Sequence, residues 1–234
     1  MAQPISIPRK QQGFTLVEIA IVLVIIGLLL GGILKGQEMI VQARIKNVIN
    51  DFNGVTAAYA GYQDRYRAIP GDDNGAAGAT GRWTDLAAAL NGDRNGQIAG
   101  KWNSTTANDE SRLFWLHLRR AGFVPGTGQD QPNNATAGLL GVQTADAGAV
   151  PKPALGSDAN GTGGFAGILL CSGNLPDKIS IAVDTQMDDG ANGTGQVRGS
   201  RQDGPNPTTA DVNANSTTAY AETGTNQYLL CKNL

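Results

Sequence analysis

The feature that most constrains this 234-residue chain is an apolar run near its N-terminus, interrupted by only one threonine and one glutamate. The run has 21 residues, from Phe14 to Leu34. As a helix it would be about 31 Å long, close to the ~30 Å hydrocarbon core of a bilayer. It therefore predicts a membrane-spanning helix over 14–34. Arg9 and Lys10 precede it, and the positive-inside bias predicts a cytoplasmic N-terminus with the remainder exported.

The glutamate in this run, Glu18, needs an explanation, because an unpaired ionisable side chain inside a bilayer costs a few kcal/mol or more. If the chain is cut after Gly13, the new amine of Phe14 lies about one helical turn from Glu18. A neighbouring chain could supply the same amine. The alternative is that Glu18 lies close enough to the interface to reach water.

The residues GFTLVE at positions 13–18, after a short basic leader, closely resemble the prepilin signature of type IV pilins and of the pseudopilins of type II secretion. The resemblance implies that a membrane prepilin peptidase removes leader residues 1–13, cutting after Gly13, and N-methylates Phe14. It also implies that Glu18 neutralises the Phe14 amine of an adjacent subunit as the helix enters a filament. Many members have proline at the position held here by Lys35.

On this resemblance we expect a structural subunit and not an enzyme. The expected partners are copies of itself or other pilins, the prepilin peptidase and an inner-membrane assembly platform. The precursor would lie in the inner membrane with a periplasmic head, before it joins a filament. The subunit would serve a type IV pilus, as a minor or atypical member, a type II secretion pseudopilus or a DNA-uptake filament. A membrane-anchored periplasmic binding or enzymatic domain is the alternative of another class.

A second pattern predicts that the helix continues far beyond the membrane run. Apolar residues from Val41 to Ile69 recur at spacings that alternate between 4 and 3, which is one helical stripe. Pro70 then disfavours helix at the residue before it. We expect one helix over 14–69, with 41–69 packed on the head. A two-stranded coiled coil is the competing interpretation.

Residues 70–234 are expected to form the head, with an antiparallel sheet that accepts the helix stripe, which makes the fold α+β and pilin-like. A short helix is expected over 109–123. Polar, glycine-rich composition predicts long loops over 125–164 and 188–226. The expected strands are Phe165–Cys171, Lys178–Asp184 and Gln227–Cys231, with a fourth candidate near Gln196–Arg198.

The two cysteines, Cys171 and Cys231, both follow short apolar runs. If the head is exported, its compartment permits a disulfide between them. Closing a loop of about 60 residues would stabilise the head by roughly 4 kcal/mol in the chain-entropy model. Two buried free thiols are the alternative.

The segment NGDRNGQI, starting at Asn91, partly matches a calcium loop. Oxygen-bearing side chains alternate at Asn91, Asp93, Asn95 and Gln97, and a glycine stands where such a loop turns sharply. No glutamate follows at the twelfth position, so Glu110 or its neighbouring aspartate would have to complete the site. The alternative is an ordinary Asn-Gly turn, and no cofactor is otherwise required.

Other groups give weaker signals. The acids Asp184, Asp188 and Asp189 form a second, weaker calcium candidate, and the DDNG segment at 72–75 is expected to be the turn after the long helix. His117 is the only histidine, and its apolar neighbours favour a structural role. The formal net charge of −2 gives no basic face for nucleic acid.

Overall fold

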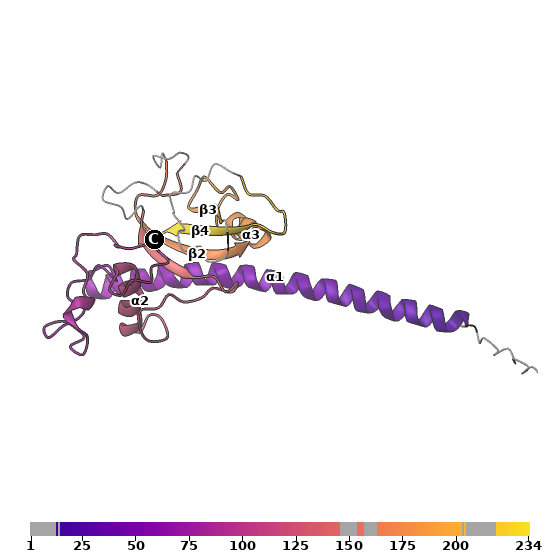
Figure 1. Ribbon diagram of the computed structural model, residues 1–234, viewed down its shortest axis with the longest axis horizontal. Helices are drawn as coiled ribbons and strands as arrows, with labels where there is room; N and C mark the ends of the chain where they lie inside the picture. Colours follow the sequence, from indigo (N-terminus) through magenta and orange to yellow (C-terminus); the bar gives the residue numbers. More distant parts are fainter. Residues whose placement is uncertain (1–12, 14, 146–153, 157–162, 203, 205–218) are drawn as a thin grey trace, which may run out of the picture. The chain divides into compact units, whose positions relative to one another are not determined.

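The computed structural model describes residues 13, 15–145, 154–156, 163–202, 204 and 219–234 (Figure 1). Its elements in chain order are α1 (Leu16–Tyr66), the 3-10 turn η1 (Ala88–Leu90), α2 (Glu110–Arg120), β1 (Leu140–Thr144), β2 (Ile168–Pro176), α3 (Asp177–Met187), β3 (Val197–Gln202) and β4 (Gln227–Asn233). The chain divides into two compact units between Gln42 and Ala43, inside α1. The expected helix over 14–69 is thus observed over 16–66.

The first unit contains the apolar part of α1. Its large hydrophobic side chains are exposed from Leu16 to Ile40, with exposed fractions of 46% to 90%. This part of α1 is long and apolar enough to cross a membrane by length and composition. Such a surface requires a lipid or protein environment, because monomeric proteins in water rarely leave so large an apolar area uncovered.

The second unit contains the rest of α1, which packs on the head. One stripe of this part is buried, and its members lie at helical spacing: Ile45, Val48, Phe52, Val55, Ala58 and Tyr62. This confirms that the stripe meets the head instead of a second helix of a coiled coil. The helix ends where Arg67 adopts a left-handed conformation with a φ of 53° and its N–H bonds to the carbonyl of Gln63.

The head is built on a four-stranded antiparallel sheet in the order β1-β2-β4-β3 (Figure 1). This confirms the predicted α+β fold. The two edge strands are partly covered by other backbone: Leu140 of β1 donates to the carbonyl of Pro132, and Gly199 of β3 donates to that of Asn192. Covered edges do not offer free backbone groups for pairing with another strand.

The predicted disulfide is present, because β2 and β4 pair with Cys171 directly opposite Cys231. Both cysteines are fully buried, in a cluster with Trp102, Leu169 and Leu229. The bridge joins residues 60 apart in the sequence, and so closes β3 and the segment around it into one loop of the head.

The strand predicted at Lys178–Asp184 is wrong, because this segment belongs to helix α3. Apolar residues at 179, 181 and 183 alternate as in a strand, but a run this short also fits a helix. In the structure Ile179, Ser180, Val183 and Asp184 are the side chains buried within this segment, which is a helical pattern. Asp177 begins the helix and fixes its entry, since its carboxylate accepts bonds from the backbone of Lys178, Thr223 and Gly224.

The long loop predicted over 125–164 is also wrong in part, because it contains β1. All five residues of this strand are buried, so it lacks the alternation that identifies a half-exposed strand. Gly141 is required there, since a Cβ atom would lie 1.9 Å from the carbonyl oxygen of Trp102. The loop predicted over 188–226 likewise contains β3, which overlaps the fourth strand candidate.

Candidate functional site

The N-terminal candidate residues lie at the start of α1. Gly13 precedes the helix, Phe14 lies outside the described residues, and Glu18 is in the first helical turn. The Glu18 carboxylate accepts hydrogen bonds from the backbone N–H of Thr15, at 2.8 Å, and from its hydroxyl, at 2.9 Å. The Thr15 hydroxyl in turn accepts from the Glu18 N–H at 3.3 Å. This reciprocal arrangement is a capping box.

The capping box gives Glu18 two neutral donors from its own chain. It does not supply a counter-charge, because both donors from Thr15 are neutral groups. The sequence could have indicated this contact, because T-x-x-E is the capping pattern. Nothing in the described residues bears on pairing with Phe14.

The other end of the apolar segment carries a surface ion pair. Lys35, at the position where the resembled family often has proline, lies 2.8 Å from Glu38, and both side chains are largely exposed. The helix is continuous through this position. The lysine therefore places a charged pair just beyond the apolar run.

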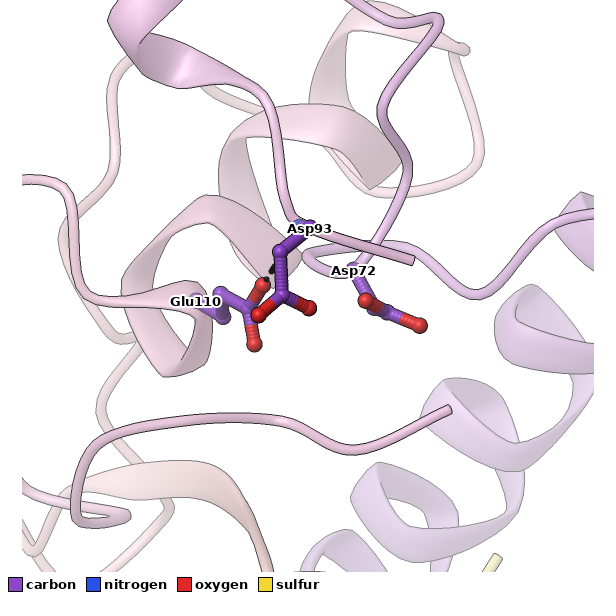
Figure 2. A group of neighbouring side chains, drawn as sticks. All are labelled: Asp72, Asp93 and Glu110. Atoms are coloured by element: carbon purple, nitrogen blue, oxygen red, sulfur yellow. Dashed lines mark hydrogen bonds between the residues drawn. The ribbon is translucent and has the colours of Figure 1, made fainter. Parts of the chain in front are cut away.

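The head contains a group of three carboxylates that could hold a metal ion. Asp72, Asp93 and Glu110 each offer an oxygen atom, and these atoms lie within 4.8 Å of one another (Figure 2). The three come from the turn after α1, the 91–98 loop and the first residue of α2. Asp72 and Glu110 are buried, with 3% and 7% of their surface exposed, whereas Asp93 is exposed.

Backbone amides hold two of these carboxylates in place. Asp72 accepts hydrogen bonds from the N–H groups of Asn95 and Gly96. Glu110 accepts from the N–H groups of Asp93 and Ala99. Burial raises the pKa of Asp72 and of Glu110 above the ordinary value, and the amide bonds oppose this rise. A bound cation would favour the charged form of all three acids.

The structure brings together only some of the residues suggested by the sequence. Asp93 and Glu110 lie close together. The side chain of Asn91, however, is bound to the backbone of Ala77: its amide oxygen accepts from the Ala77 N–H, and its amide nitrogen donates to the Ala77 carbonyl. The oxygen of Asn95 accepts from the N–H of Gln97. The side-chain oxygens of Asn91 and Asn95 are therefore not free to bind calcium as the loop pattern predicts.

Asp72 is the member of the group that sequence reasoning missed. The sequence predicts only a turn after the long helix for the segment around it, and the segment does make that turn. Its side chain reaches a loop more than 20 residues further along the chain. No local sequence pattern predicts such a contact, because the contact depends on how the head folds.

The second acid group, Asp184, Asp188 and Asp189, also gathers within 4.8 Å. Each of its carboxylates already has donors. Asp184 accepts from the hydroxyl of Tyr220 at 2.6 Å, and Asp188 accepts from backbone N–H groups that lead into β3. Through these bonds the three acids stabilise the turn between α3 and β3.

His117 is a structural residue of the head. Its Nδ1 accepts from the N–H of Gly71 at 2.9 Å and its Nε2 lies 2.9 Å from the carbonyl oxygen of Leu90, which fixes the neutral tautomer with the proton on Nε2. The ring also stacks near Tyr62 and Trp83. Burial, together with the nearby charge of Arg82, lowers the pKa of His117 to about 4, although the hydrogen bond to Leu90 opposes the shift.

We predict that His117 makes the head sensitive to acid. An unfolded histidine takes up its proton near pH 6.5, whereas folded His117 does so only near pH 4. The stability that it contributes is complete above about pH 7 and falls by about 3 kcal/mol as the pH drops to 4. Because this is the only histidine, the single imidazole signal in an NMR titration gives the pKa of His117 directly.

A midpoint near 6.5 in that titration would contradict the buried, neutral state. His117→Gln serves as the control for stability, since acids such as Asp72 have raised pKa values and act in the opposite direction. The variant should be less stable than the wild type at pH 7.5. The difference in unfolding free energy between the wild type and His117→Gln should be smaller at pH 4 than at pH 7.5 by about 3 kcal/mol.

Comparison with known proteins gave one match, over the N-terminal segment. The prokaryotic N-terminal methylation motif matches residues 8–34. Neither the search of characterised proteins nor that of solved structures found a match. The matched residues include Gly13, Phe14 and Glu18, together with the apolar run. The chain therefore carries at its N-terminus the signature of type IV pilins and pseudopilins, which are structural subunits.

Proposed function

We propose that this protein is a structural subunit of a type IV pilus or of a related filament, and that it assembles through α1. The observation that carries the proposal is the methylation motif at residues 8–34, which continues into an exposed apolar helix with one acid. The peptidase would cut after Gly13 and methylate Phe14. Copies of the chain, or other pilins, would then cover the apolar helix surface in the filament core.

In this proposal Glu18 is the residue that favours assembly over remaining in the bilayer. Its two donors from Thr15 are neutral, whereas a protonated amine supplies an opposite charge as well as N–H donors. A neighbouring subunit that offers the Phe14 amine would therefore provide a better partner. The precursor would be held in the inner membrane with its N-terminus in the cytoplasm and its head in the periplasm.

A pilus in which the protein is a minor subunit and a type II secretion pseudopilus both fit this description. Shearing of surface filaments from wild-type cells and from cells that lack this gene distinguishes them. For a pilus, the protein should be present in the sheared fraction, and its loss should change the number or length of surface filaments. For a pseudopilus, the surface fraction should lack it, and secretion of exported enzymes should stop.

We also propose that Asp72, Asp93 and Glu110 bind calcium. Three carboxylates, two of them buried, supply the hard oxygen ligands that this ion prefers. The ion would tie the turn after α1 to the 91–98 loop and to the start of α2. It would therefore order the part of the head that lies between α1 and the sheet-forming segments in the sequence.

We predict that removing calcium lowers the melting temperature of the detergent-solubilised protein. At a calcium concentration 100 times the dissociation constant, the ion would stabilise the head by about 2.7 kcal/mol, or roughly 5 to 10 °C for a domain of this size. Asp93→Asn should abolish the shift, because this exposed residue can lose its charge without disturbing the core. Asp85→Asn, an exposed acid paired with Arg120, is the matched control and should keep it. If calcium removal lowers the melting temperature of Asp93→Asn as much as that of the wild type, calcium does not bind at these three carboxylates.

A further inference from the structure

A carboxylate on the head portion of α1 has no charged partner in the part of the chain that the structure describes. Asp51 is half-buried, and no described residue donates a hydrogen bond or an ion pair to it. The helix positions one turn away on either side are Asn47, Val48, Gly54 and Val55, and none of them is basic. Partial burial without compensation raises its pKa, so the isolated subunit is penalised for keeping this charge.

Asp51 lies in a pocket of about 270 Å³, which is lined by Asn47, Asn50, Asp51, Asn133, Asn134 and Ala135. One wall is fixed by Asn134, whose amide donates to Ser172 and Gly173 and accepts from Thr136 and Gly138. The amides of Asn47, Asn50 and Asn133 have no hydrogen-bond partner among the described residues. The pocket therefore presents one half-buried carboxylate and three solvent-exposed amides beside the hydrogen-bonded Asn134.

This chemistry suits a single positive charge that carries several N–H donors. A guanidinium or ammonium group would neutralise Asp51 and donate to the amide oxygens around it. A divalent metal ion would remain only half neutralised there. The chain gathers three carboxylates elsewhere, at Asp72, Asp93 and Glu110, so the charge count favours a basic side chain at Asp51.

The chain itself carries basic side chains that are available for such a contact. Five are exposed and have no side-chain partner among the described residues: Arg44, Lys46, Arg94, Lys178 and Arg201. We propose that the pocket around Asp51 receives an arginine or lysine side chain from a second copy of this chain. The inference rests on the proposed filament and on copies of this chain being neighbours in it, and it assigns that filament a contact between heads.

The first experiment compares incorporation with stability. Asp51→Asn keeps the shape of the side chain and removes its charge, so it should lower the amount of protein in sheared filaments about tenfold. The melting temperature of the detergent-solubilised subunit should stay the same or rise, because the subunit alone gains nothing from the charge. Asp64→Asn is the matched control, since this acid lies on the same helix but is 85% exposed and only 3.6 Å from Arg67. It should assemble normally.

The second experiment identifies the partner by charge exchange. Asp51→Arg should block assembly, and an Asp substitution at the correct one of the five basic positions should restore it in the same chain. Restoration by one of them supports the proposal and names the contact. Failure of all five overturns it. Binding of calcium or magnesium that is lost in Asp51→Asn also overturns it, in favour of a metal site.

Glu18→Gln separates this inference from the proposed function. If Asp51→Asn is incorporated like the wild type while Glu18→Gln is not, the contact at Asp51 is wrong and the filament stands. If the wild-type protein itself enters neither a surface filament nor a periplasmic pseudopilus, the filament proposal is wrong.

Discussion

Replacing Glu18 with glutamine is expected to lower incorporation into filaments about 100-fold while leaving cleavage after Gly13 and the stability of the head unchanged. Glutamine preserves the capping box with Thr15, because its side-chain oxygen accepts the same hydrogen bonds. It removes the charge that an amine of the next subunit would pair with. A loss of about 3 kcal/mol from that pairing corresponds to about two orders of magnitude.

The measurement is the amount of protein in sheared filaments, relative to the amount in membranes. Glu38→Gln is the control, because it removes the other acid of the first unit, which lies at the opposite end of the apolar segment and pairs with Lys35. It should assemble within a few-fold of the wild type. Normal assembly of Glu18→Gln would show that the acid serves only to cap the helix.

Removing the disulfide is expected to cost the head about 4 kcal/mol of unfolding free energy. The bridge closes a loop of 60 residues, and the chain-entropy model gives about this value for such a loop. The comparison is between the wild type and the double variant Cys171→Ala, Cys231→Ala, by urea unfolding in detergent. Fluorescence of the buried Trp102 and Trp115 reports the transition.

The single variant Cys171→Ala provides the control, since it removes the bond but leaves the second sulfur in the core. If the bond is the main contribution, the single and double variants should lose nearly the same stability. A loss below about 1 kcal/mol in the double variant would mean that packing around the cysteines holds β2 to β4 without the bond.

The long helix and the disulfide could be predicted because their signals are local or repeated. The 4-3 spacing from Val41 to Ile69 identifies one stripe over several turns. Five of its members are buried, namely Ile45, Val48, Phe52, Val55 and Tyr62, whereas Tyr59 is only partly buried beside the buried Ala58. The cysteines stand in two apolar runs that become paired strands. Periodicity and residue type are sufficient in such cases, because tertiary packing only confirms what each segment already prefers.

The errors arose where tertiary contacts override a short local pattern. The segment that forms α3 contains three alternating apolar residues, and only the sheet decides that Val183 and Asp184 are both buried. Strand β1 is fully buried and contains a glycine that the backbone of Trp102 requires. Neither condition can be derived from five or seven residues alone.

The candidate sites show the same division. Gly13, Phe14 and Glu18 form a contiguous motif, and the sequence alone indicates them. Asp72 and Asp51 could not be found in this way. Asp72 lies near Asp93 and Glu110 only in the folded head. Asp51 stands out only because no described residue of the folded head places a cation beside it.

The central claim is tested most directly by the mass of the N-terminus. We expect the protein purified from cells with an active prepilin peptidase to begin at Phe14 and to carry one additional methyl group on its amine. Mass spectrometry of the N-terminal peptide measures both features at once. Protein that still begins with the residues before Gly13 in such cells would contradict the proposed filament subunit and would favour a domain that uses α1 only as an anchor.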